Sequence, residues 1–293
     1  MTRPIRIGVL VALLITAIGT LWWMRDPTPV ALTPAEVGAT RFADVAYGPH
    51  DRNRFDVYVP EGAGPHPTVI WFHPGGWVHG DKAASMPVWD WTERGYAVVS
   101  VNYRYADDPD TVNDSVDDAI AAVRRIRTGQ TEWDLDVDRM GIYGFSAGGH
   151  LAAMVGHAGG VDADLRVAAI AIAGAPTDFV ALLDPAVPFF DGNRGPDVVV
   201  AVQDLLGCTS SPATCEARAS AASPARLDPG PADLLVVHAA NDHIVDVDQA
   251  HRLQAHLEAA GSPAQVVVVD EGGHSPLLEE GGIAEFFDER LLS

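Results

Sequence analysis

The sequence Gly-Phe-Ser-Ala-Gly at residues 144–148 constrains the fold of this chain more than any other stretch. The apolar run before it, residues 140–143, is typical of a strand, and residues 149–155 after it are typical of a helix. A serine between a strand and a helix lies on a sharp turn that exposes its hydroxyl. The pattern predicts that Ser146 is a nucleophile, although serine flanked by glycines also occurs in ordinary turns.

Strand and helix patterns alternate along the rest of the chain. Apolar or alternating runs predict strands at 41–47, 55–59, 68–72, 96–101, 140–143, 167–172, 234–238 and 265–269. Helical spacing of apolar residues predicts helices at 115–127, 147–155, 247–260 and 283–292, the first of them capped by Asp114. The alternation predicts an α/β fold with a mostly parallel central sheet, helices on both faces, and strands at 234–238 and 265–269 buried on both sides.

The 293 residues divide into three expected regions. Residues 1–25 form a membrane anchor or signal segment, residues 26–39 a linker rich in Pro, Thr and Ala, and residues 40–293 the catalytic domain. One stretch of that domain, at about 176–231, is rich in Pro, Asp, Ala and Ser and breaks the alternation. We expect it to be a small cap-like insertion over the carboxyl ends of the strands.

The N-terminal segment has the pattern of a targeting sequence. Arg3 and Arg6 precede an uncharged apolar run at residues 7–24, which is long for a cleaved signal and just long enough for one spanning helix. Trp22 and Trp23 favour an uncleaved anchor, and cleavage remains the alternative. In both cases the body of the protein is expected outside the cytoplasm, either anchored or secreted.

The net charge disfavours some classes of binding partner, and the two cysteines bear on the cellular compartment. A formal net charge of -21 argues against nucleic acid and anionic lipid surfaces as partners. The only two cysteines, Cys208 and Cys215, flank a short polar loop, and outside the cytoplasm they are expected to form a disulfide. The sequence leaves the oligomeric state open.

A reactive serine requires a base and an acid that orients the base. Asp242 follows the predicted strand at 234–238, and His274 follows the one at 265–269, so both belong to the same sheet edge as Ser146. Asp246 and Asp248 are rivals to Asp242, but their place favours capping the next helix. The order serine, aspartate, histidine along the chain predicts a triad of Ser146, Asp242 and His274.

Acyl transfer also requires donors for a developing oxyanion. The sequence His-Pro-Gly-Gly-Trp at residues 73–77 directly follows a predicted strand. Backbone N–H groups of Gly75, Gly76 and Ala147 are the expected donors, although a Pro-Gly turn alone is the simpler interpretation of residues 74–76.

These motifs, with Asn-Tyr-Arg at 102–104 and Asp-His-Ile-Val at 242–245, resemble the α/β-hydrolase esterases over roughly residues 40–292. The resemblance is to carboxylesterases and lipases near the hormone-sensitive-lipase-like and the acetyl-xylan or feruloyl esterase-like groups. It implies the α/β-hydrolase fold, Ser146 as nucleophile, Asp242 and His274 as its partners, and the oxyanion donors named above. Pro74 departs from the family pattern, which usually has glycine there, and a proline has no N–H to donate.

The predicted activity is the hydrolysis of a small-molecule carboxylic ester through an acyl-enzyme, possible substrates including acetylated carbohydrates. No cofactor and no metal are expected. A lipase, an amidase or a peptidase of the same fold remain alternatives, and apolar runs at 187–190 and 198–202 are consistent with a lipase lid. A catalytically inactive binding module is a further alternative, which the presence of all three triad residues disfavours.

Overall fold

The computed structural model describes residues 38–83, 88–107, 110–189, 196–209, 211–262, 264–277 and 281–293. The predicted anchor or signal segment at 1–25 and nearly all of the predicted linker at 26–39 lie outside these residues. Within the described ranges, no helix is both long and apolar enough to span a bilayer.

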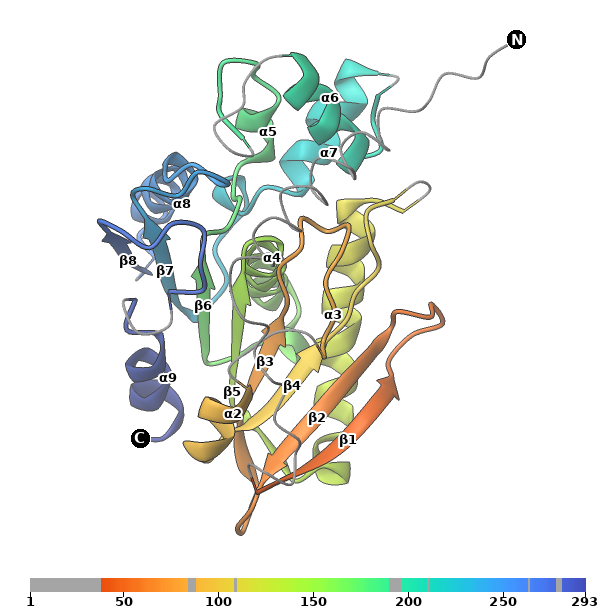
Figure 1. Cartoon of the computed structure of the whole chain (residues 1–293), viewed down its shortest axis with the longest axis vertical. Coiled ribbons are helices and arrows are strands. Elements are labelled where there is room, and N and C mark those ends of the chain that lie inside the picture. The colour runs from red at the N-terminus through yellow and green to blue at the C-terminus, as the bar shows by residue number, and fades with distance from the viewer. Residues whose placement is uncertain are drawn as a thin grey trace.

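One eight-stranded sheet runs through the described part of the chain (Figure 1), in the order β1-β2-β4-β3-β5-β6-β7-β8. Strands β1 and β2 pair antiparallel, as do β2 and β4, and every pair from β4 to β8 is parallel. The predicted α/β fold with a mostly parallel sheet is therefore confirmed. The strands are β1 (Ala39–Ala46), β2 (Arg54–Pro60), β3 (His66–Phe72), β4 (Ala97–Val101), β5 (Leu135–Phe145), β6 (Ala169–Ala173), β7 (Asp233–Ala239) and β8 (Ala264–Val269).

Helices cover both faces of the sheet and make two hydrophobic layers. Neighbouring strand residues point to opposite faces: Ile70 packs in one layer with α3, α4 and α8, whereas Trp71 packs in the other with α2 and α9. The helices are α2 (Val88–Glu93), α3 (Val112–Thr128), α4 (Ala147–Val161), α5 (Phe179–Leu182), α6 (Pro196–Leu205), α7 (Pro212–Ala221), α8 (Asp248–Ala259) and α9 (Ile283–Leu291). Burial on both faces explains the continuous apolar runs of the central strands.

Two local predictions are wrong. Helix α3 is capped by Thr111, not by Asp114, which instead occupies the third helical position and accepts from the Thr111 N–H at 2.8 Å. The two residues form a capping box, so the helix begins one turn earlier than its apolar spacing suggested. Strand β8 is not buried on both faces: it lies at the edge of the sheet, where Val268 is 41% exposed.

The chain between β6 and β7 contains α5, α6, α7 and the short 3-10 helix η4 (Pro224–Arg226), and it spans the region predicted as an insertion. Figure 1 shows α5, α6 and α7 grouped at one end of the molecule, apart from the helices that cover the sheet. A disulfide joins Cys208, just after α6, to Cys215 within α7. Buried side chains from α5, α6 and α7 join the same hydrophobic layer as α4.

Candidate active site

Ser146 lies on the sharp turn between β5 and α4. Its backbone has φ 56° and ψ -123°, and its N–H donates to the Ala173 carbonyl at 2.9 Å. A Cβ at Gly144 would lie 2.2 Å from the Gly148 carbonyl oxygen, so a side chain at position 144 would collide with the first turn of α4. The turn therefore needs glycine where strand and helix approach most closely.

The side chains of Ser146, His274 and Asp242 form one continuous chain of hydrogen bonds. His274 Nε2 lies 2.9 Å from Ser146 Oγ, and His274 Nδ1 lies 2.8 Å from Asp242 Oδ2. The three residues come from turns after β5, β8 and β7, which end at the same edge of the parallel sheet.

The rival aspartates lie elsewhere. Asp246 Oδ1 accepts from the Asp248 N–H at 2.9 Å, where α8 begins. Asp248 pairs with Arg252 at 2.7 Å along the same helix. Both carboxylates therefore make their contacts in the first turns of α8, and it is Asp242 that bonds to His274.

Asp242 is buried and accepts hydrogen bonds from three donors. Its Oδ1 accepts from the N–H groups of Ile244 at 2.8 Å and Val245 at 3.0 Å. Its Oδ2 lies 3.4 Å from His238 Nε2 in addition to its bond with His274. Burial alone would raise the pKa of Asp242, but the neighbouring His238 and His274 rings and the Val245 N–H outweigh it and lower the pKa far below its usual value. The carboxylate is therefore ionised.

Two neighbours of this pair were not predicted as site residues. His238 belongs to β7; its Nε2 donates to the Val245 carbonyl at 2.8 Å and lies 3.4 Å from Asp242 Oδ2. Gly174 has φ 51°, and a Cβ there would lie 3.3 Å from Asp242 Oδ2 and 3.4 Å from His274 Nδ1. For Gly174, the indication in the sequence was a glycine after a buried strand, and this by itself predicts only a turn.

The 73–80 loop follows β3 and lies against the start of α4. A Cβ at Gly148 would lie 2.7 Å from the carbonyl oxygen of His73, the first residue of the loop, which shows how closely the two segments approach. Gly75 and Gly76 have φ of 135° and 57°, values that favour glycine. Among the residues that the structure describes, the N–H groups of Gly75, Gly76 and Ala147 have no hydrogen-bond acceptor.

Aromatic packing connects this loop to α4 and to the insertion. The Trp77 ring lies edge-on to His150 of α4 at 5.3 Å and tilted against Phe179 of α5 at 5.4 Å, and all three side chains are buried. His150 Nε2 donates to the Ala222 carbonyl, just after α7, at 2.8 Å. Burial lowers the pKa of His150 to about 4, so the ring is neutral near pH 7.

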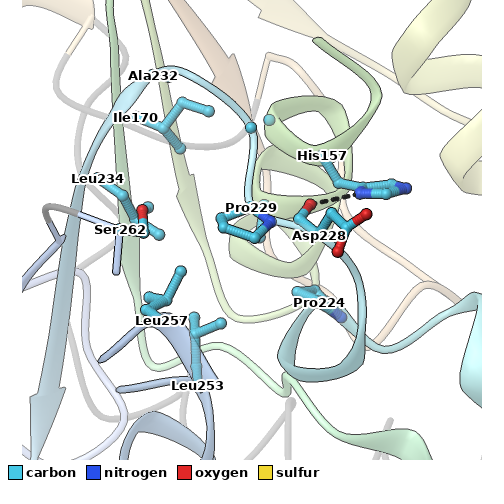
Figure 2. Close-up of a pocket in the computed structure, with 13 residues that line it drawn as sticks. His157, Ile170, Pro224, Asp228, Pro229, Ala232, Leu234, Leu253, Leu257 and Ser262 are labelled. Carbon is cyan, nitrogen blue, oxygen red and sulfur yellow. Dashed lines mark hydrogen bonds between the residues drawn. The ribbon is translucent and has the colours of Figure 1, made fainter. Parts of the chain in front are cut away.

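A separate crevice lies between α4, α8 and the segment that leads from η4 into β7 (Figure 2). Its walls are mostly apolar, and at its rim His157 Nδ1 donates to the Asp228 carbonyl at 2.7 Å. None of the residues predicted for catalysis lines it. Over the described ranges, no group of three or more His, Cys, Asp or Glu side chains is arranged to hold a metal ion.

Curated proteins with similar sequences are hydrolases by name. A probable isoprenylcysteine alpha-carbonyl methylesterase of Arabidopsis thaliana is 34% identical over 111 residues, which is 37% of this chain and 23% of that protein. The kynurenine formamidase of Danio rerio is 34% identical over 115 residues, 38% of this chain and 37% of that protein. The probable carboxylic ester hydrolase LipM of Mycobacterium tuberculosis is 25% identical over 256 residues, 80% of this chain and 57% of that protein. The chain thus spans well under two thirds of the length of these relatives.

Solved structures share the fold at lower sequence identity. A truncated carbohydrate esterase from gut microbiota superposes with a TM-score of 0.75 and 23% identity, over 89% of this chain and all of the other. Esterase B from Lactobacillus rhamnosis superposes with a TM-score of 0.73 and 19% identity, over 96% of this chain and 93% of the other. The BD-FAE family matches residues 55–257, from the start of β2 almost to the end of α8. The chain therefore has the α/β-hydrolase fold and belongs to the BD-FAE family.

Proposed function

We propose that this protein is a serine hydrolase that cleaves carboxylic esters through an acyl-enzyme. The observation that carries the proposal is the unbroken hydrogen-bond chain from Ser146 Oγ through His274 to the ionised carboxylate of Asp242. Serine hydroxyls become nucleophilic when a neutral imidazole can take their proton, and a carboxylate holds that imidazole in the required tautomer. The family and the names of its relatives agree with this chemistry.

Asp242 sets the direction of proton transfer. Its Oδ2 can only accept, so His274 carries its proton on Nδ1 and presents the Nε2 lone pair to the Ser146 hydroxyl. His274 takes the proton as Ser146 Oγ attacks the ester carbonyl carbon. The same proton then passes from Nε2 to the departing alcohol oxygen as the carbon–oxygen bond breaks. A water molecule repeats the cycle on the acyl-enzyme and releases the acid.

The oxyanion of each tetrahedral intermediate is stabilised by backbone donors. We assign this role to the N–H groups of Gly75, Gly76 and Ala147. These groups have no acceptor among the described residues, and Ala147 is the first residue of α4, where the helix dipole favours negative charge. Pro74, which lacks an N–H, precedes both glycine donors and removes neither of them.

The direct test replaces the nucleophile. For Ser146→Ala we expect kcat for p-nitrophenyl acetate to fall by at least about 10⁴-fold, because a triad without its nucleophile keeps only background catalysis. A fluorophosphonate probe should label the wild type and fail to label the variant. Wild-type turnover by Ser146→Ala would refute the proposal, and absence of turnover and labelling in the wild type would favour an inactive binding module.

The preferred substrates are soluble esters with short acyl groups, carbohydrate acetates among them. In the two apolar runs considered for a lipase lid, Phe189 and Val202 are buried, and Val187 and Val198 are partly buried against the same hydrophobic layer, so these four side chains are largely covered by the protein itself. A panel of p-nitrophenyl esters should show highest kcat/KM for acetate to butyrate. An optimum at twelve carbons or more would favour the lipase alternative instead.

Hydrolysis of a formamide is the second candidate, favoured by the 34% identity to a kynurenine formamidase. The same hydrogen-bond chain would attack a formyl carbon and protonate an amine leaving group. N-formyl aniline derivatives should be assayed beside phenyl esters of matched size. A higher kcat/KM for the amide would make formamide hydrolysis the preferred function over ester hydrolysis.

We also propose that the body of the protein works outside the cytoplasm, anchored or released at its N-terminal segment, with the insertion as a cap over the site. The disulfide between Cys208 and Cys215 supports an oxidising compartment. Fractionation of cells, with N-terminal sequencing of the mature protein, tests both the location and the cleavage of the segment.

A further inference from the structure

The 73–80 loop is held at both ends by tyrosines that follow β4. Tyr103 donates its hydroxyl to the His73 carbonyl at 2.8 Å, and the two rings stack with centroids 4.4 Å apart. Tyr105 donates its hydroxyl to the Gly80 carbonyl at 2.6 Å. The loop therefore has a fixed first residue and a fixed last residue.

Arg52, from the turn between β1 and β2, joins these two anchoring points. Its Nε donates to the Tyr103 carbonyl at 2.8 Å, and its Nη2 donates to the Gly80 carbonyl at 3.0 Å. Its guanidinium group also lies over the Tyr105 ring, 3.8 Å from the centroid. A planar guanidinium with several fixed donors suits such a junction in a way that a lysine ammonium does not.

The same guanidinium faces the imidazole of His73, which is fully buried. His73 Nδ1 lies 2.7 Å from the Pro74 carbonyl, which can only accept, so Nδ1 carries the proton and Nε2 is an acceptor. Arg52 Nη2 lies 3.4 Å from that Nε2. Burial lowers the pKa of His73 to about 4, so this neutral tautomer persists across ordinary assay conditions.

We propose that Arg52 is a positioning residue for ester hydrolysis, which fixes both ends of the 73–80 loop so that the N–H groups of Gly75 and Gly76 point at the oxyanion. The inference rests on the proposed function, because it assigns Arg52 no contact with the reacting atoms. Oxyanion donors act only within a few tenths of an ångström of their required place, and a shift of about 1 Å can cost 10²-fold in rate. The turn between β1 and β2, at the antiparallel edge of the sheet, thus helps to fix the positions of the Gly75 and Gly76 N–H groups near the centre of the sheet.

The test compares Arg52→Met with Arg54→Met in the full chain. Arg54 is two residues away, and within the described part of the chain its side chain donates only to the neighbouring Asn53 carbonyl, from Nη1 at 3.0 Å. For Arg52→Met we expect kcat for p-nitrophenyl acetate to fall about 10-fold with KM within about 2-fold, less than the 10²-fold or more that follows the loss of a whole donor. The inhibition constant of an alkyl boronic acid, which forms a tetrahedral adduct with serine, should rise by a similar factor. Arg52→Lys should recover part of the loss.

The outcomes separate this inference from the proposed function. If Arg52→Met and Arg54→Met turn over alike, or if KM rises while kcat is unchanged, Arg52 is not a positioning residue, even though Ser146→Ala is inactive. If Ser146→Ala keeps wild-type turnover, the proposed function has failed independently of Arg52. Should Arg52→Met not fold, Tyr105→Phe, which removes the other donor to Gly80, should lower kcat about 3-fold by the same argument, and an unchanged kcat would overturn the inference.

Discussion

The two sides of Ser146 are held by different kinds of contact. On one side, the side chains of His274 and Asp242 bond directly to one another and to the serine hydroxyl. On the other side lies the backbone of the 73–80 loop, which depends on side chains such as Arg52 and Tyr103 from other segments. The difference predicts that a substitution of His274 or Asp242 removes nearly all turnover, whereas a substitution around the 73–80 loop lowers kcat by a smaller factor.

The largest expected effect is on the His274 side. Asp242→Asn should lower kcat by about 10³ to 10⁴-fold, because an amide can donate to His274 and so stabilise the wrong tautomer. Asp246→Asn is the matched control: Asp246 accepts from the start of α8 and should change kcat less than about 3-fold. Steady-state kinetics of both variants checks this. A kcat for Asp242→Asn within 10-fold of the control would contradict the expected requirement for the Asp242 carboxylate.

A graded effect is expected on the loop side. Gly80→Ala would bring a Cβ within 2.4 Å of the Pro74 carbonyl oxygen and 2.5 Å of His73 Nδ1, and it should lower kcat about 10 to 100-fold by displacing the loop. Gly95→Ala is the control, because Gly95 also has positive φ, at 89°, but its Cβ would contact nothing within 4 Å. It should cost about 1 to 2 kcal/mol of stability, because a Cβ disfavours positive φ, and leave kcat unchanged. Equal kcat for the two variants would show that the loop geometry does not limit the rate.

The disulfide lies in the insertion, where it joins the segment after α6 to α7. Replacing Cys208 and Cys215 together by serine should lower the free energy of unfolding by about 2 kcal/mol, because the bond closes only a short loop. Turnover by the folded variant should match the wild type. Urea denaturation and an assay well below the melting temperature check the two statements, with the reduced wild type as control. A fall in kcat above 10-fold would mean that the disulfide itself holds the insertion in the position that the site requires.

The last prediction concerns the pH dependence of stability rather than turnover. Burial lowers the pKa of His73 and of His150 to about 4 from the ordinary 6.5, so between these values the unfolded chain binds protons that the folded chain does not. Stability should therefore fall as pH decreases from 6.5 to 4, by about 1.4 kcal/mol per pH unit for each histidine. Asp242, whose folded pKa is lowered, stabilises the fold above its unfolded value of 3.8 and loses that contribution only below it.

Urea denaturation at several pH values measures these slopes. His150→Gln should remove one histidine's share of the slope between pH 6.5 and 4 and leave the loss below pH 3.8 in place. His251→Gln, which replaces an exposed histidine on α8, serves as the control and should keep the wild-type slope. A slope that His150→Gln leaves unchanged would mean that His150 is protonated in the folded protein.

The amino-acid sequence by itself determined the strand–turn–helix around Ser146, the alternation that makes a mostly parallel sheet, and the chain order of Ser146, Asp242 and His274. These are local patterns or consequences of topology, since parallel strands end at one edge whatever their order in the sheet. Only the tertiary structure decided that β8 is an exposed edge and that His238 and Gly174 lie next to Asp242. It also decided that Arg52 donates to the carbonyl of Gly80, at the end of the 73–80 loop. Arg52 is separated from Gly80 by 28 residues and from Tyr103 by 51, and contacts over such distances leave no periodicity in a single sequence.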